Sequence, residues 1–190
     1  MAARIPTDGI ARAVNLYCIT DSAAVAARAA RAGAAMIQVR AKGLPARALL
    51  DLVTEILRAA GPARVLVNSR LDIALAAGAQ GLHLPSNSPA PARLRRITPA
   101  GFLIGASCHS LDDLRRAERE GADFAVYGPV FPTRSHPGAP PLGLARFAAD
   151  VRTVSLPVYA LGGVTPANAE TCIAAGAAGI AGISFFEQLT

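Results

Sequence analysis

The stretch Gly33-Ala34-Ala35-Met36-Ile37-Gln38-Val39 contains a pattern that occurs four times in this chain. In each copy a Gly-Ala pair is followed at once by an apolar run, and the other copies begin at Gly78, Gly121 and Gly176. The pattern is typical of the end of an Ala-rich helix, a glycine in the left-handed conformation, and a buried strand. The chain therefore contains an internal repeat of helix and strand.

The spacing of the four copies leaves room for a further strand beside each of them. The intervals between the glycines are about twice the length that one strand-helix unit needs. A strand-like run precedes the first copy and lies in each interval. These runs are Leu16 to Thr20, Arg64 to Val67, Phe102 to Ala106, and Pro157 to Leu161. Eight strands that alternate with helices predict an α/β fold, the (β/α)8 TIM barrel, and argue against an open sheet.

Length and composition agree with a single TIM-barrel domain over residues 1–190, with strands from about 15 to 184. The chain has 190 residues, 52% of them hydrophobic, and is short for a barrel of about 250 residues. Only Phe185 to Thr190 follow the eighth strand, so we expect a curtailed C-terminal helix. The outer wall there is expected to be bare or covered by Met1 to Arg12 or a partner, which includes a second copy in a homo-oligomer.

No segment predicts a membrane-bound or secreted protein. No apolar run reaches the roughly 18 residues that span a bilayer, and Met1 to Ala13 lacks the apolar core of a signal peptide. We therefore expect a cytoplasmic protein without membrane contact. The three cysteines have neither metal-site nor redox spacing and are interpreted as small buried groups. They are Cys18, Cys108 and Cys172.

The positive charge does not predict a nucleic-acid partner. The formal net charge is +6, but the arginines are scattered over predicted helices and form no basic tail with interleaved aromatic residues. The 19 basic residues include a single lysine, Lys42. An ammonium group is a compact point charge, unlike the planar guanidinium, so the position of this lysine suggests a specific contact.

Polar residues gather at the predicted carboxyl ends of the strands, where TIM barrels carry their active sites. After the second strand, period-two alternation directs Gln38, Arg40 and Lys42 to one side. Two cations and an amide there suit a pyrophosphate or a carboxylate. The alternative interpretation is a set of exposed strand-end charges.

Two further strand ends combine mouth residues with helix-capping patterns. Capping boxes are expected at Ser69 to Asp72 and at Ser110 to Asp113. Capping explains neither Asn68 nor Arg70, which we place at the mouth. Ser107 and His109 precede the second box and are interpreted either as site residues or as structural residues. In the fourth strand, His83 stands between two leucines and is either a hydrogen-bonded core residue or a catalyst.

A phosphate site is predicted after the last two strands. The seventh strand ends in Leu161-Gly162-Gly163, and Thr165-Pro166 fits the cap and first position of a helix. The eighth strand ends before Ser184. Paired glycines with exposed N–H groups, a short helix and a small polar residue are what a barrel's phosphate site requires.

The long loop from Gly128 to Pro141 is interpreted as a lid. If it closes over a ligand, Thr133, Ser135 and His136 supply hydrogen bonds, while its prolines limit the entropy lost on ordering. His136 is then a candidate cation toward phosphate or a candidate proton carrier.

Seven ordered motifs at the predicted strand ends point to a known family. They are Tyr17-Cys18-Ile19-Thr20-Asp21, Gln38-Val39-Arg40-Ala41-Lys42, Val67-Asn68-Ser69-Arg70-Leu71-Asp72, Gly81-Leu82-His83-Leu84, Gly105-Ala106-Ser107-Cys108-His109-Ser110, Tyr127-Gly128-Pro129-Val130-Phe131-Pro132-Thr133 and Leu161-Gly162-Gly163-Val164-Thr165-Pro166-Ala167-Asn168. Taken together, they resemble the thiamine phosphate synthase and TenI family. The resemblance implies the (β/α)8 fold. It also implies that a synthase would join hydroxymethylpyrimidine diphosphate to thiazole phosphate with magnesium and release pyrophosphate.

The resemblance further implies the roles of individual residues. The pyrimidine diphosphate would be bound by Gln38, Arg40, Lys42 and Asn68, with Ser107 close to the pyrophosphate. The thiazole phosphate would be bound by Gly162, Gly163 and Ser184.

The chain departs from the synthase pattern at positions that handle charge. Where synthases carry metal-binding aspartates, this chain has Ser69 and either Asn87 or Ser88. A hard cation would lose its carboxylates, so no metal ligand is predicted. No cofactor is firmly implied, and magnesium is expected only if the synthase interpretation holds. The phosphate-binding lysine of the synthases falls at His136.

The run Leu84-Pro85-Ser86-Asn87-Ser88 is closer to the TenI branch, whose members isomerise the thiazole phosphate by a proton transfer without metal. Pro129 takes the place of that branch's usual histidine and cannot transfer a proton. The candidate acid/base groups are therefore His136, followed by His109 and His83.

Three functions stay open at this point. The favoured one is a TenI-like barrel of thiamine biosynthesis that handles a thiazole phosphate. The alternatives are thiamine phosphate synthase and a non-catalytic relative that binds phosphate ligands. The expected partners are small molecules: a phosphorylated thiazole and, for the synthase, a pyrimidine diphosphate.

Overall fold

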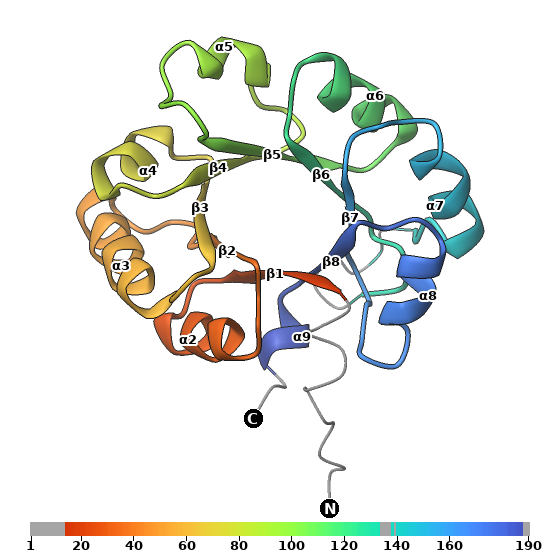
Figure 1. Cartoon of the computed structure of the whole chain (residues 1–190), viewed down its shortest axis with the longest axis horizontal. Helices are drawn as coiled ribbons and strands as arrows, with labels where there is room; N and C mark the ends of the chain where they lie inside the picture. Colours follow the sequence, from red (N-terminus) through yellow and green to blue (C-terminus); the bar gives the residue numbers. More distant parts are fainter. Residues whose placement is uncertain (1–13, 134–137, 139, 188–190) are drawn as a thin grey trace, which may run out of the picture.

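The eight strands form one closed, all-parallel barrel, which confirms the fold predicted from the repeat. The computed structural model describes residues 14–133, 138 and 140–187. The strands pair in sequence order, and β8 pairs with β1 to close the barrel (Figure 1). They are β1 (Asn15–Thr20), β2 (Met36–Val39), β3 (Arg64–Asn68), β4 (Gly81–Leu84), β5 (Leu103–Cys108), β6 (Phe124–Tyr127), β7 (Val158–Ala160) and β8 (Gly179–Gly182).

Helices form a ring around the barrel (Figure 1). They are α2 (Ala23–Arg31), α3 (Ala46–Ala59), α4 (Leu71–Ala77), α5 (Pro91–Arg95), α6 (Leu111–Arg119), α7 (Leu144–Val151), α8 (Ala169–Ala174) and α9 (Ser184–Glu187). The last of these, α9, has four residues and lies against α2. Within the described residues, the helix that follows β8 is therefore short, as predicted.

The repeated glycines have the conformation that the sequence predicts. Gly33, Gly78, Gly121 and Gly176 have φ values of 84°, 72°, 80° and 104°. A side chain disfavours this left-handed region, whereas glycine enters it without strain. Each glycine therefore ends a helix and directs the chain into the next strand.

Two predicted strand ends differ from the structure. β5 continues to Cys108, which pairs with Tyr127, so Ser107 lies inside the strand. β7 ends at Ala160, because the carbonyl of Leu161 accepts the N–H of Val130 from the loop after β6. The first residues of the loop after β6 are thus hydrogen-bonded to the end of β7.

The capping box predicted at Ser69 to Asp72 is wrong. Arg70 is the N-cap of α4 and makes no side-chain cap bond. Ser69 has a φ of 63°, and its hydroxyl accepts a hydrogen bond from the Asn68 side chain. Asp72 is paired with Arg70 instead. The capping box at Ser110 to Asp113 is confirmed.

The predicted helix start at Thr165-Pro166 is also wrong, because α8 begins at Ala169. The side chain of Asn168 accepts the N–H of Thr165 and donates to the carbonyl of Gly163. These two bonds close a turn before the helix. No helix start therefore stands directly behind Gly162 and Gly163.

Side chains inside the barrel lie in layers. The lower layer contains Tyr17, Met36, Leu66, Phe124, Tyr159 and Ala181. The rings of Tyr17, Phe124 and Tyr159 meet edge to face. A Cβ at Gly105 would collide with the Phe124 ring, and one at Gly179 with the Tyr159 ring. Glycine on these strands thus makes room for large rings on their neighbours.

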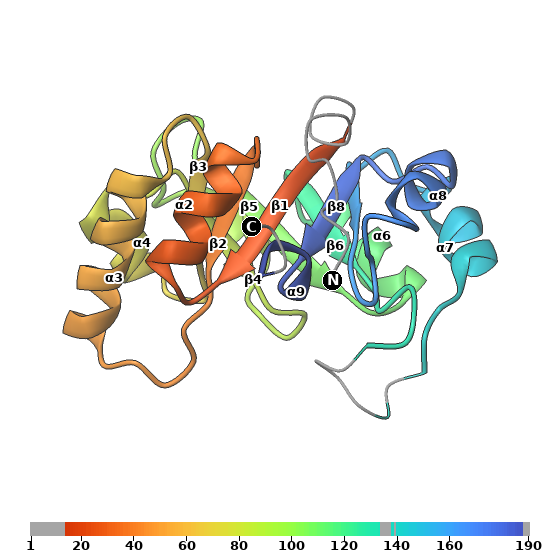
Figure 2. The ribbon, with the colours of Figure 1, turned by 90° about the horizontal axis from the view of Figure 1, so that it is seen from below.

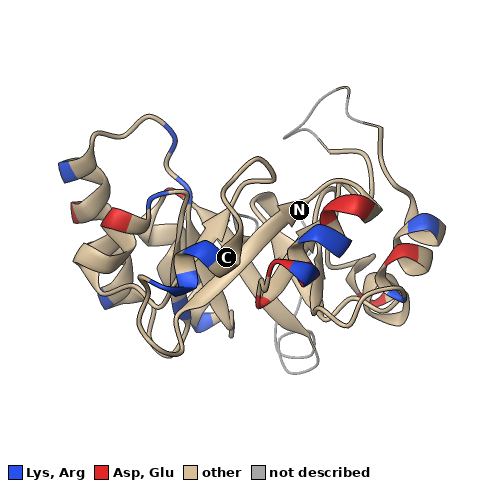
Figure 3. Cartoon of the chain, turned by 90° about the horizontal axis from the view of Figure 1, so that it is seen from above, with Lys and Arg blue, Asp and Glu red and all other residues tan. Residues whose placement is uncertain are grey.

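The remaining general predictions concern cysteines, charge and membranes. The three cysteines are buried, as expected. Basic and acidic residues are interspersed on the helices seen in Figure 3. Within 14–133, 138 and 140–187, no helix combines the length and apolar character needed to cross a bilayer. The cytoplasmic location and the homo-oligomer stay predictions.

Candidate functional site

A pocket of about 460 Å³ opens at the carboxyl end of the barrel. The loops after β2 and β4 project from this same end of the molecule (Figure 2). The inward residue two positions beyond the lower layer reaches the pocket from every strand, because side chains alternate along a strand. These residues are Ile19, Gln38, Asn68, His83, Ser107, Val126, Leu161 and Ile183.

One side of this pocket is strongly basic. Arg40 and Lys42 follow the end of β2, and both line the pocket together with Arg70. Arg70 holds Asp72 through two hydrogen bonds of 2.8 and 2.6 Å. None of the described residues that line this pocket is Asp or Glu. The pocket therefore suits an anion, as predicted for Gln38, Arg40 and Lys42.

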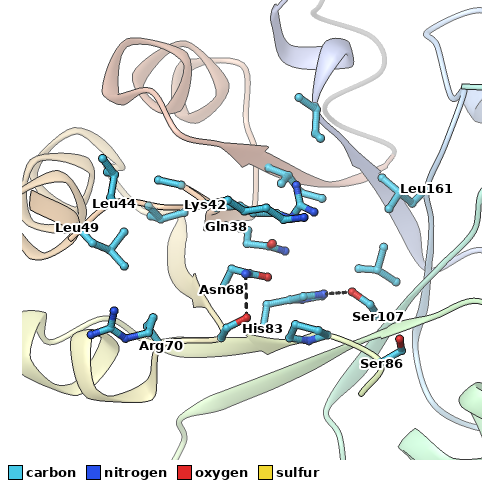
Figure 4. Close-up of a pocket in the computed structure, with 18 of the residues that line it drawn as sticks. Gln38, Lys42, Leu44, Leu49, Asn68, Arg70, His83, Ser86, Ser107 and Leu161 are labelled. Carbon is cyan, nitrogen blue, oxygen red and sulfur yellow. Dashed lines mark hydrogen bonds between the residues drawn. The ribbon is translucent and has the colours of Figure 1, made fainter. Parts of the chain in front are cut away.

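Figure 4 shows two parts of the pocket. Gln38, Asn68, His83 and Ser107 lie close to one another over the barrel axis, whereas Leu49 and Arg70 lie to the side. The Asn68 amide donates to Ser69 Oγ at 2.9 Å, which holds the amide at the mouth. Asn68 and Ser107 thus line the pocket where the sequence places them.

A buried chain of hydrogen bonds crosses the pocket floor. Gln38 Nε2 donates to Tyr17 Oη at 3.0 Å, and Tyr17 Oη lies 3.1 Å from His83 Nδ1. His83 Nε2 lies 3.0 Å from Ser107 Oγ. Burial, and secondarily the charge of Arg40, lowers the pKa of His83 to about 3. Burial raises the pKa of the Tyr17 hydroxyl. Both side chains are therefore neutral near pH 7.

A second pocket of about 110 Å³ lies beside the first, between the ends of β6, β7 and β8. Among its lining residues are Thr133, Gly162, Gly163 and Ser184, all predicted to bind substrate. In the described part of the chain, no acceptor takes the backbone N–H of Gly162, Gly163 or Val164. Consecutive free N–H groups of this kind form an anion-binding concavity.

Gly163 is required by the local backbone. Its φ is 64°, and a Cβ at this position would stand 2.5 Å from the carbonyl oxygen of Pro132 and 2.7 Å from the Cβ of Phe131. A side chain would therefore be strained and would also collide with the loop after β6. The phosphate prediction is supported here by free N–H groups alone, since the expected helix start is absent from this position.

His109 lies where the two pockets meet. It lines both of them, as do Leu161 and Ile183. His109 Nδ1 donates to the carbonyl oxygen of Gly128 at 2.9 Å. In the neutral ring, this bond leaves Nε2 without a proton and able to accept one. His109 is thus placed for the acid/base role predicted for it.

Two predicted site residues, Ser135 and His136, lie outside the described residues, as do the other masked positions of the predicted lid, 134, 137 and 139. Their roles stay predictions. Tyr17 was missed as a candidate, although it lies in β1 at an inward position. The signal was available, since strands that carry glycine at that layer, at Gly81 and Gly105, leave room for a large ring.

The donor set does not fit a magnesium ion held by the protein. Mg²⁺ in proteins is usually bound through one or two carboxylates. The first pocket offers amide and hydroxyl oxygens, from Asn68, Ser69 and Ser86, but no carboxylate among its described lining residues. Nor do the residues of 14–133, 138 and 140–187 contain a group of three His, Cys, Asp or Glu side chains that could hold a metal.

Comparison with known sequences identifies a family. The family described as thiamine monophosphate synthase matches residues 16–186. The chain is similar to the thiamine-phosphate synthase of Methanoculleus marisnigri, with 46% identity over 90% of this chain and 86% of that protein. It is also similar to the thiamine-phosphate synthase of Roseiflexus castenholzii, with 39% identity over 89% of this chain and 79% of that protein.

Comparison with solved structures agrees with the family match. Thiamine phosphate pyrophosphorylase from Pyrococcus furiosus superimposes with a TM-score of 0.81 and 34% sequence identity. The alignment covers 90% of this chain and 86% of that one. The residues that match the family, 16–186, include all the described residues that line the two pockets.

Proposed function

Because this chain belongs to the thiamine monophosphate synthase family, we propose that it is a transferase of thiamine biosynthesis that joins two phosphorylated substrates. The observation that carries this proposal is the pair of adjoining pockets, each suited to an anion, that share His109 at their junction. One pocket would suffice for a reaction of a single substrate. Two pockets in contact suit the joining of two molecules.

The charges assign a substrate to each pocket. The larger pocket, with Arg40 and Lys42 on one side, has the volume and the cations for hydroxymethylpyrimidine diphosphate. The smaller pocket, with the free N–H groups of Gly162 to Val164, fits the phosphate of the thiazole. A thiazole anchored by its phosphate then lies next to the pyrimidine.

The proposed reaction breaks one bond and forms another. The C–O bond between the pyrimidine methylene and the diphosphate breaks, and pyrophosphate leaves with the electron pair. The thiazole nitrogen supplies the electron pair of the new C–N bond. Negative charge grows on the departing oxygens, and the cations that line this pocket, Arg40 and Lys42, lower the barrier electrostatically. We assign this stabilisation to the two side chains, because the described lining of the larger pocket offers no carboxylate to hold a metal ion.

The test is whether both pockets fill at once. Inorganic pyrophosphate and thiazole phosphate serve as probes in calorimetry, because together they cannot react. We expect each to bind with one site, and saturation with one to change the Kd of the other less than about threefold, since separate pockets do not exclude each other. Mutual exclusion of the two probes would contradict the two-pocket proposal.

A second candidate is the TenI-like proton transfer on the thiazole phosphate, which the sequence favours. His109 supports it, because its Nε2 is directed away from the Gly128 bond beside the smaller pocket. This reaction needs one pocket and one acid/base group. It also agrees with the lack of carboxylates in the described lining of the larger pocket.

A further inference from the structure

In the hydrogen bonds across the pocket floor, the donor and the acceptor of each bond can be assigned, and every donor lies on the Gln38 side and every acceptor on the Ser107 side. We propose that Tyr17 and His83 are positioning residues that make Ser107 a hydrogen-bond donor toward the ligand and leave the Gln38 carbonyl oxygen as an acceptor. The direction follows from the protons that each member of the chain carries.

The first step is the Tyr17 hydroxyl, which has one proton and lies fully buried. Its oxygen accepts the Nε2–H of Gln38 at 3.0 Å. The remaining partner within reach is His83 Nδ1 at 3.1 Å. A buried hydroxyl without an acceptor is costly, so the Tyr17 proton is donated to His83 Nδ1.

The second step is the ring of His83, which is buried and neutral because its pKa is lowered to about 3. A neutral imidazole carries one proton, on one of its two nitrogens. Nδ1 accepts from Tyr17, so the proton is on Nε2. That N–H donates to Ser107 Oγ, 3.0 Å away.

The third step concerns Ser107 and Gln38, the two ends of the hydrogen-bond chain, which both line the larger pocket. Ser107 Oγ accepts a hydrogen bond from His83 Nε2–H, so the Ser107 hydroxyl proton can be donated to a ligand oxygen. The Gln38 amide donates one N–H to Tyr17 Oη, which fixes the orientation of the amide. Its carbonyl oxygen is then available to accept an N–H of the ligand. The floor thus presents a donor on β5 and an acceptor on β2.

This asymmetry selects the orientation of the ligand. An anionic oxygen is accommodated at Ser107, and a ring amino or N–H group at Gln38. The identity of that ligand as a pyrimidine diphosphate rests on the proposed function, whereas the proton positions do not. Tyr17 and His83 act through their neighbours, and neither is required to exchange a proton with substrate.

The proton positions can be measured on the free protein by ¹⁵N NMR of labelled histidines. The His83 signals are assigned by their loss in His83→Gln. We expect an unprotonated Nδ1 and a protonated Nε2, unchanged between pH 5 and 8, because the neutral form persists well above a pKa of about 3. A proton on Nδ1, or titration within this range, would overturn the proposal. This result does not depend on turnover, so failure of the proposed function leaves it intact.

A double-mutant cycle then tests the effect on binding, with inorganic pyrophosphate as the probe. Ser107→Ala is expected to weaken binding about tenfold, as loss of a hydrogen bond to a charged group does. Tyr17→Phe should weaken it about threefold in the parent, because Ser107 is then no longer held as a donor, and should have no effect in Ser107→Ala. Equal effects of Tyr17→Phe in the two backgrounds would contradict the coupling.

Tyr159→Phe is the matched control for this cycle. Tyr159 lies in the same layer and its ring meets that of Tyr17, but its hydroxyl makes no hydrogen bond among the described residues. We expect pyrophosphate affinity and the His83 signals to stay at parent values in this variant. If Tyr159→Phe lost as much pyrophosphate affinity as Tyr17→Phe, the effect would come from barrel packing, and the proposal would be overturned.

Discussion

Gly163→Asp is expected to abolish binding of thiazole phosphate. The substitution forces a Cβ into contact with Pro132 and Phe131 at a φ of 64°, and it brings a negative charge to the phosphate site. Each charge-assisted hydrogen bond contributes about 1.5–3 kcal/mol, so the loss of two should weaken binding by about 100-fold or more. Calorimetry with thiazole phosphate measures this effect.

Gly78→Asp provides the control for Gly163→Asp. Gly78 ends α4 with a φ of 72°, and a Cβ there would meet nothing within 4 Å. This variant therefore introduces the same backbone strain and the same charge outside both pockets. It should bind thiazole phosphate as the parent does. Parent-like binding by folded Gly163→Asp would show that the phosphate lies elsewhere.

The second large effect is expected from removing two cations, in the variant Arg40→Ala/Lys42→Ala. Both residues follow the end of β2 and line the larger pocket. The affinity for hydroxymethylpyrimidine diphosphate should fall by about 100-fold, because two charge-assisted contacts to the diphosphate are lost. Thermal unfolding should change little, since solvated charges contribute little to stability.

Arg47→Ala/Arg58→Ala removes the same number of charges from α3, outside both pockets. This control separates a specific contact from the general positive field of the protein, which also attracts anions. We expect it to bind the diphosphate within about twofold of the parent, because solvated charges that do not line the pocket are weakened by salt screening. Equal losses in the two double variants would contradict the assignment of Arg40 and Lys42.

The fold was predictable because its signal is repeated. Four glycines with positive φ each precede a buried strand, and their spacing, together with the apolar runs beside them, implies eight units. Mouth residues such as Gln38 and Ser107 were predictable too, because alternation along a strand fixes which side chains point inward. The sequence thus places side chains relative to the barrel without knowledge of their contacts.

The failures concern which polar groups become hydrogen-bond partners, both between near neighbours and between residues distant in the chain. Ser69 resembles a helix cap, but its hydroxyl is taken by Asn68 and its N–H by the carbonyl of His83. Thr165 resembles another cap, but Asn168 closes a turn first. The link from Tyr17 to His83 joins side chains 66 positions apart. Local patterns do not specify which of several polar partners will meet in three dimensions.

The most direct measurement is the joining reaction itself, with both substrates and with or without a chelator. The account predicts equal amounts of thiamine phosphate and pyrophosphate. It also predicts that the chelator slows the reaction less than about tenfold, because cationic side chains rather than carboxylate-bound magnesium stabilise the leaving group. No joined product while both substrates are bound, with exchange of the thiazole tautomers alone, would contradict the account and favour the TenI-like reaction.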